Sequence, residues 1–184
     1  LENPQHQITP IRSVVEVFRG MEKNTYDNAH NEDIHSNVCS LTSQELADNI
    51  KRVIEENNIP ESQSYITTGN DACIEMETGT GKTLTYIQTA YELNKVYGLT
   101  KFIVLVPSVP IRQGVIDTID NFKEQLADKY EITPNAFVYD SSKLSLLRDF
   151  IVDDSLQIMV MTMASFNSED KILNQAEREG LFNN

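Results

Sequence analysis

One stretch of eight residues constrains the fold of this chain more than any other. Residues 76–83 read Met-Glu-Thr-Gly-Thr-Gly-Lys-Thr; a short apolar run at 72–76 leads into them, and a helix-like pattern follows over 83–97. A strand, a glycine-rich turn ending in Lys-Thr and then a helix is the context in which a P-loop match has physical meaning. The glycines let successive backbone N–H groups curl around an anion, and the helix N-terminus adds partial positive charge.

The side chains of this loop have distinct predicted roles. Lys82 is expected to reach the β- and γ-phosphates, and the Thr83 hydroxyl is expected to bind Mg²⁺, so these two form the predicted catalytic pair. Met76 stands where the strict pattern has glycine, but the Gly-x-Gly-Lys-Thr core is intact. A turn that only joined a strand to a helix would leave the Lys-Thr pair unexplained. The predicted nucleotide-binding residues of the loop are Thr78, Gly79, Thr80, Gly81, Lys82 and Thr83.

The overall composition suits one globular domain. The chain has 184 residues, of which 40% are hydrophobic and 23% are charged, which is enough for a core of ordinary size. No apolar run approaches the length of a membrane span, and the first residues lack a signal-peptide pattern. Cys39 and Cys73 imply no disulfide framework, which fits a reducing cytoplasm. We expect Cys73 to be buried in the strand before the P-loop.

The net charge of −13 bears on the choice of partners. A domain that binds DNA on its own is expected to be basic, because the neutralisation of DNA phosphates by Lys and Arg supplies most of the affinity. Strong autonomous DNA binding is therefore not expected of this chain.

Residues 21–40 are polar and predict a surface loop. His30 and His35 lie there near Glu32 and Asp33, which raises the question of a metal site. Nothing else in the chain supplies ligands at a recognised spacing, so we interpret these side chains as a solvated loop.

The periodicity of apolar residues predicts the other elements. A first helix is expected with Thr9 as N-cap, Pro10 at its first position and Gly20 at its end, so that Gln7 precedes it. Thr42 and Glu45 form a capping box that starts a second helix. Further helices are expected over 83–97, 111–126 and 144–151, and strands over 65–68, 72–76, 102–106, 136–139 and 157–161.

Strands that alternate with helices in this way predict an α/β fold, with a mostly parallel sheet and helices on both faces. The continuous apolar run at 102–106 is typical of a strand buried on both faces. Ligands bind such sheets at the carboxyl ends of the strands. Three segments are expected at that edge: the P-loop, residues 107–108 and residues 162–167.

Several segments together resemble the Res subunit of type III restriction–modification enzymes, which belong to the superfamily 2 helicases. They are the P-loop at 76–83, Glu-Leu-Asn-Lys at 92–95 with Tyr97-Gly98, and the run at 101–115. Methionine commonly opens the loop in that family. The resemblance implies that residues 1–184 are the N-terminal part of a first RecA-like domain, which binds ATP and Mg²⁺.

The resemblance also implies roles for single residues. Gln7 looks like the glutamine of the Q motif, which reads the adenine edge; alternatively, it is a solvated residue. Pro107, Ser108 and Arg112 resemble motif Ia, which touches the nucleic-acid backbone, although Arg112 could be a plain surface charge. The residues resembling the next DNA-facing motif are Thr162, Ser165, Phe166 and Asn167, where Ser165 could instead cap the last helix.

ATP hydrolysis by this machinery needs an acidic pair at the end of an apolar strand. Asp153-Asp154 follows the apolar residues 150–152, but these continue a helical stripe, so we interpret the pair as a helix end. Ser168-Glu169-Asp170 follows a loop and not a strand, so we interpret these residues as a polar helix cap and not as the acidic motif. In the Res family the acidic motif comes later than 165–167, so we expect a fragment of a larger protein that is inactive alone.

The resemblance therefore implies the ATP-binding motor of a type III restriction endonuclease, which is a hydrolase that cleaves double-stranded DNA. It also implies a modification methyltransferase subunit as partner, and no association with a membrane. One alternative is another superfamily 2 helicase or translocase without a nuclease. A second is a small self-contained P-loop kinase or NTPase, which would need a basic lid that the 15 Lys and Arg residues do not form.

Overall fold

The computed structural model describes residues 4–25, 36–60 and 71–166, and the chain divides into two compact units. The helical unit comprises Leu1–Thr25 and Asn37–Leu99, and the sheet unit comprises Tyr26–Ser36 and Thr100–Asn184. Among the helices in the described ranges, none combines the length and the apolar character that crossing a bilayer requires. The strand expected at 65–68 and the four polar residues weighed as metal ligands (His30, Glu32, Asp33 and His35) lie outside the described residues.

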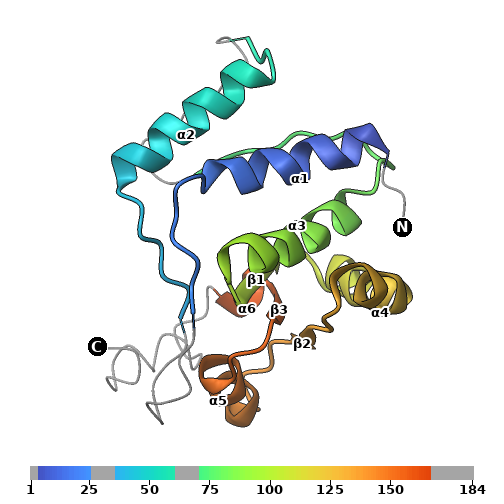
Figure 1. The fold of residues 1–184 in the computed structure, drawn as a ribbon. Helices are drawn as coiled ribbons and strands as arrows, with labels where there is room; N and C mark the ends of the chain where they lie inside the picture. Colours follow the sequence, from blue (N-terminus) through green and yellow to red (C-terminus); the bar gives the residue numbers. More distant parts are fainter. Residues whose placement is uncertain (1–3, 26–35, 61–70, 167–184) are drawn as a thin grey trace. The chain divides into compact units, whose positions relative to one another are not determined.

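The helical unit contains α1 (Gln5–Val17), α2 (Ser43–Glu56) and α3 (Lys82–Tyr97), with α1 in contact with both other helices (Figure 1). The predicted capping box is confirmed: the Thr42 hydroxyl accepts from the Glu45 N–H, and the Glu45 carboxylate accepts from the Thr42 N–H. The inward stripe of α2 buries Leu46 and Val53. Gly98 ends α3 in the left-handed conformation, as its position predicted.

The start of α1 differs from the prediction. The helix begins at Gln5, with Pro4 as N-cap, and Pro10 lies inside it. The N–H groups of Gln7 and Ile8 both donate to the Pro4 carbonyl, which closes a first turn upstream of the expected cap. The Thr9 hydroxyl is engaged instead by the Gln5 side-chain amide. Gln7 therefore lies within the helix and not before it.

The strand predicted before the P-loop is absent. Residues 72–76 have no regular secondary structure, Ile74 is 44% exposed, and Cys73 is an exposed free thiol instead of a buried one. A strand needs a neighbour to satisfy its N–H and C=O groups. In the part of the chain that the structure describes, no strand pairs with 72–76.

The sheet unit confirms the predicted parallel α/β arrangement. Its three strands pair in the order β1-β3-β2, and both pairings are parallel. The elements in chain order are β1 (Lys101–Val106), α4 (Val109–Tyr130), β2 (Asn135–Val138), α5 (Leu144–Val152), β3 (Gln157–Thr162) and α6 (Met163–Phe166).

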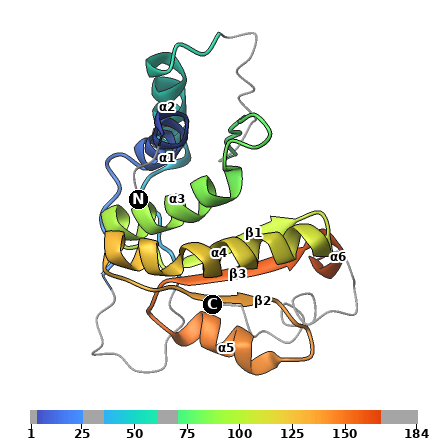
Figure 2. The same cartoon turned by 90° about the vertical axis from the view of Figure 1, so that its right-hand side faces the viewer.

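Helices cover both faces of the central strand β3, whose six residues are all buried. On one face, Leu147 of α5 packs with Tyr139, Met159 and Met161. On the other side, α4 contacts all three strands (Figure 2). The buried residues of α4 include Val115. Because strand side chains alternate between faces, β3 needs both helices to be fully covered.

The prediction that the strand at 102–106 is buried on both faces is wrong. Ile103 is 57% exposed and Leu105 is 43% exposed. These residues pair in register with Met159 and Met161 and share their face of the sheet, which α5 covers over β2 and β3. The strand β1 lies at the edge of the three, so this face of it is left open within the sheet unit.

Candidate functional site: the P-loop and its neighbours

The P-loop has the backbone geometry that its glycines permit. Gly79 has a φ of +82° and Gly81 a φ of +86°, both in the left-handed region that residues with a Cβ rarely adopt. Gly81 is the N-cap of α3, so the free N–H groups of that helix begin directly after the loop. The loop therefore combines a tight turn with a helix N-terminus, which suits an anion.

Lys82 holds the loop together in this structure. Its ammonium donates to the carbonyls of Met76 and Glu77, both at 2.8 Å. The Thr80 hydroxyl also donates to the Glu77 carbonyl, at 2.7 Å. Lys82 is exposed, and its acceptors are neutral. A phosphate oxygen is a stronger acceptor for an ammonium, because both partners are charged.

Thr83 lies in the first turn of α3, half-buried. Its hydroxyl shares a hydrogen bond with the Tyr86 phenol one turn later. Burial raises the pKa of Tyr86, and the bond to Thr83 opposes that rise. A threonine hydroxyl is an oxygen donor of the kind that Mg²⁺ prefers as a ligand. Thr78 is exposed at the tip of the loop.

Gln7 is brought to the P-loop from far away in the sequence. Its side-chain Nε2 donates to the Thr80 carbonyl at 2.9 Å, across 73 residues. A Cβ placed on Gly81 would lie 2.4 Å from the same Nε2 atom. The absence of a side chain at Gly81 therefore serves two purposes, the left-handed turn and the close approach of Gln7.

Sequence reasoning did not single out Asn49, Arg52 and Tyr97. Asn49 is buried on the inward face of α2 and binds the end of α1. One signal was available: Asn49 lies three residues after Leu46 and four before Val53, so a polar residue stands on an apolar stripe. A buried amide must find partners. Arg52 belongs to no recognised motif, and Tyr97 was noted only as part of the resemblance at residues 97–98.

In the sheet unit, two of the predicted DNA-facing segments share one edge. Val106 and Thr162 are paired in register at the carboxyl ends of parallel strands, so Pro107 and Met163 both follow at that edge. Thr162 caps α6: its hydroxyl lies 2.8 Å from that of Ser165 and accepts from the Ser165 N–H. The alternative that Ser165 caps a later helix concerns residues outside the described ranges. Asn167 lies outside the described residues, and the P-loop belongs to the helical unit.

The remaining predicted DNA contacts lie at the start of α4. Ser108 is its N-cap, and the Ser108 carbonyl accepts from the Arg112 N–H at 3.0 Å. Pro107 is exposed, and Arg112 is half-buried. The Arg112 Nε is buried and has no hydrogen-bond partner among the described residues. It is a donor that a phosphate or a water molecule could satisfy.

Asp153 has a structural explanation. It is the C-cap of α5, which confirms the interpretation of 150–152 as helix. Its Oδ1 accepts from the Ser155 N–H at 2.8 Å, and that bond holds the pKa of Asp153 below its usual range. Its carbonyl accepts from the Lys101 ammonium. No group of three or more potential metal ligands occurs within the described residues.

Comparison with known proteins identifies the family. A family model described as "Type III restriction enzyme, res subunit" matches residues 6–183. Over 145 residues the chain is 35% identical to the EcoPI Res subunit of Escherichia phage P1 and 34% identical to the EcoP15I Res subunit of Escherichia coli. Over 62 residues it is 42% identical to the StyLTI Res subunit of Salmonella typhimurium.

The first two alignments cover 77% of this chain and 15% of the length of each relative. The third covers 33% of this chain and 6% of its relative. The parallel sheet, the P-loop and the matched family agree on a RecA-like, helicase-type fold. The chain therefore belongs to the family of type III restriction enzyme Res subunits.

Proposed function

We propose that this chain binds ATP with Mg²⁺ at residues 76–83, as part of the motor of a type III restriction endonuclease. The observation that carries the proposal is the position of Lys82. Its ammonium is held inside a loop with two left-handed glycines, at the start of a 16-residue helix. Phosphate oxygens entering the loop would replace neutral carbonyls as partners of that ammonium.

The other loop residues have matching tasks in this proposal. The N–H groups of Thr78, Gly79, Thr80 and Gly81 would surround the phosphates, and Thr83 would exchange its bond to Tyr86 for Mg²⁺. Gln7 would read the adenine edge from its place beside Thr80.

For the whole protein, the proposal follows the names of the relatives, which are Res subunits of restriction–modification enzymes. The whole protein would use ATP to translocate or switch on double-stranded DNA and cleave it, together with a modification methyltransferase subunit. Pro107, Ser108, Arg112, Thr162, Ser165 and Asn167 would face the DNA backbone. The buried Arg112 Nε, for which the described residues provide no hydrogen-bond partner, supports this, because Arg donors suit phosphate oxygens.

Binding without turnover is proposed for the chain alone. Hydrolysis needs an Asp to hold Mg²⁺ and a Glu to position water. Within the described residues, no Asp-Glu pair follows a strand, and Asp153 is occupied in a turn. The ATP site would therefore hold its ligand without splitting it.

A binding titration tests the proposal. A fluorescent ATP analogue with Mg²⁺ is added to the parent chain and to Lys82→Ala, and we expect Lys82→Ala to weaken binding at least tenfold. Lys95→Ala is the matched control, because Lys95 lies in the last turn of the same helix and the change removes the same charge. Equal affinity for the parent chain and Lys82→Ala, with both folded, would contradict the proposal.

A further inference from the structure

We propose that Asn49, Arg52 and Tyr97 are positioning residues that set the preference of the P-loop for adenine, because they hold α1 where Gln7 reaches Thr80. The inference rests on the proposed ATP site and extends it to residues that lie outside the loop. Its basis is that hydrogen bonds tie both ends of α1 to the helical unit, through side chains of α2 and α3 at the C-terminal end and through the Thr80 carbonyl at Gln7.

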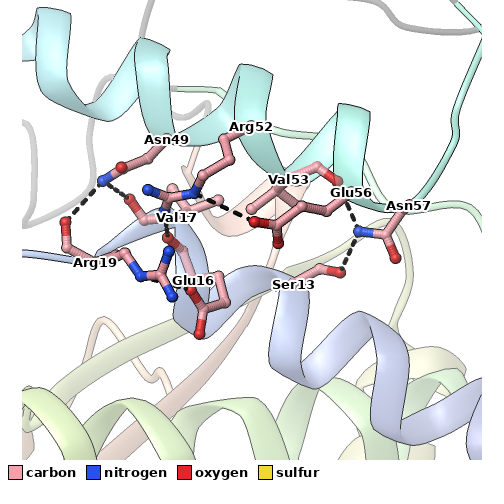
Figure 3. A network of polar contacts seen from close by, with 9 residues as sticks. All are labelled: Ser13, Glu16, Val17, Arg19, Asn49, Arg52, Val53, Glu56 and Asn57. Atoms are coloured by element: carbon pink, nitrogen blue, oxygen red, sulfur yellow. Dashed lines mark hydrogen bonds and ion pairs between the residues drawn. The ribbon is translucent and has the colours of Figure 1, made fainter.

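The C-terminal end of α1 is held by three side chains from two helices, and Figure 3 shows the two that belong to α2, Asn49 and Arg52. The Asn49 amide donates to the carbonyls of Val17 and Arg19, both at 2.9 Å. Arg52 Nη2 donates to the Glu16 carbonyl at 3.3 Å. From α3, the Tyr97 hydroxyl donates to the Val15 carbonyl at 3.0 Å.

The carbonyls of Val15, Glu16 and Val17 belong to the last turn of α1, where α-helical N–H partners run out, and the Arg19 carbonyl follows that turn. The Val15 and Glu16 carbonyls also accept from the N–H groups of Phe18 and Arg19. The last turn of α1 also contains no basic residue. Asn49 is only 8% exposed and both of its amide hydrogens are used, so moving α1 would leave a buried donor without a partner. That penalty fixes both the rotation and the axial position of the helix.

The N-terminal end of α1 carries Gln7, ten residues before Val17, or about 15 Å along the helix axis. Pro10 lies between the two residues and lacks a backbone N–H, but α1 is continuous from Gln5 to Val17, so a shift at Val17 also displaces Gln7. The bond from Gln7 to Thr80 has a length of 2.9 Å and would be lost with a displacement of less than 1 Å. The position of α1 on α2 and α3 therefore controls whether Gln7 stays beside the P-loop.

The bond to Thr80 also fixes which way the Gln7 amide points. The Thr80 carbonyl is an acceptor, so the nitrogen must face it and the Gln7 carbonyl oxygen faces the other way. An amide oxygen accepts from the N6 amino group of adenine, whereas guanine presents an acceptor oxygen at the same position. A Gln7 that is held in this orientation would favour adenine over guanine.

The measurement is the ratio of GTP to ATP dissociation constants, each with Mg²⁺, for the parent chain and its variants. We expect the parent chain to prefer ATP, and Gln7→Ala to lower the ratio about fivefold, the effect of about one hydrogen bond. Asn49→Ala should lower it by a similar factor. The double variant should lose little more, because both changes remove the same contact. Tyr97→Phe, which removes only the hydroxyl, should have a smaller effect in the same direction.

Two controls separate positioning from stability. Leu126→Ala opens a cavity in the sheet unit, which contains neither α1 nor the P-loop, and should lower the melting temperature without changing the ratio. Gln44→Ala removes an amide whose bond lies within α2, and it should change neither quantity. The inference is overturned if the parent shows no preference for ATP, if Gln7→Ala keeps the ratio, or if Asn49→Ala lowers only the melting temperature. Lys82→Ala should weaken ATP and GTP binding alike, and its failure to do so would refute the proposed site itself.

Discussion

The side chain of Gln7 and the backbone of Thr80 are joined by a hydrogen bond of 2.9 Å, although 73 residues separate them. This contact ties α1 to the P-loop within the helical unit. It depends on Gly81, because any Cβ there would meet the Gln7 amide nitrogen at 2.4 Å. The glycine pattern of the loop is thus linked to a residue outside the motif.

The first prediction compares the two loop glycines. Gly81→Ala places a methyl group against Gln7, whereas a Cβ on Gly79 meets no atom within 4 Å. Both changes force alanine into the left-handed region, so each should destabilise the fold by roughly 1–2 kcal/mol in urea denaturation. Only Gly81→Ala should also displace Gln7, and removing Gln7 in that background should recover part of the lost stability. The absence of any recovery would contradict the contact.

Much of the fold could be predicted from the sequence, because the information was local. The capping box of Thr42 and Glu45, the helix after the P-loop and the strand at 157–162 all follow from spacing within a few residues. The predictions that failed depend on which segments of the chain pack against one another. Whether 72–76 forms a strand, or Ile103 is covered, depends on which segment lies alongside, and no local pattern specifies that. The helix start at Gln5 was missed because its first turn closes on Pro4, ahead of the stronger signal at Thr9.

In the candidate site, too, the local features could be predicted from the sequence and the tertiary contacts could not. The loop and the positive φ of its glycines follow from the motif itself. The placement of Gln7 beside Thr80, by contrast, is a tertiary contact across 73 residues, which only the resemblance to a known motif suggested. Asn49 carried a weak signal as a polar residue on an apolar stripe, and Tyr97 carried only its place in the resemblance to a known family.

A second prediction concerns Gly98, at the end of α3. Its φ is +66°, and a Cβ there would lie 2.3 Å from the backbone oxygen of Asn24, which cannot swing aside like a side chain. Gly98→Ala should therefore cost about 2–4 kcal/mol in urea denaturation, from strain and overlap together. Gly114→Ala is the matched control: it lies inside α4 with open space around it and should stabilise by about 0.5–1 kcal/mol. Equal stability of the two variants would contradict this account.

A third prediction concerns the stability of the fold at acidic pH. The Glu45 carboxylate accepts hydrogen bonds of 2.8 Å from both the N–H and the hydroxyl of Thr42, which lowers the pKa of Glu45 below its ordinary value of 4.5. A lowered folded-state pKa gives stability that is present above pH 4.5 and is lost as the pH falls through the folded value. Glu45→Gln should therefore melt at a lower temperature than the parent at pH 7, with the gap closing below pH 4. A difference between the two melting temperatures that stays the same from pH 7 to pH 3 would contradict this account.

A fourth prediction concerns the ionisation of Tyr91 at alkaline pH. Burial raises the pKa of Tyr91 from 10.0 to about 12, and its side chain is only 1% exposed. A raised pKa in the folded state gives stability that is complete below pH 10 and is lost as the pH rises towards 12. Absorbance titration of tyrosinate should show a late component that Tyr91→Phe removes. If that variant leaves the late component unchanged, Tyr91 is not its source.

The last prediction distinguishes a structural Asp153 from a catalytic one. If Asp153 held Mg²⁺, its loss would abolish any ATP turnover. If it only orders the turn after α5, Asp153→Ala should leave ATP binding unchanged and cost about 1 kcal/mol, because the Ser155 N–H loses its acceptor. Asp154→Ala, the exposed neighbour, should change neither binding nor stability. Steady ATP turnover by the parent chain that vanishes in Asp153→Ala, with the fold intact, would restore the acidic-motif interpretation that the geometry of the turn opposes.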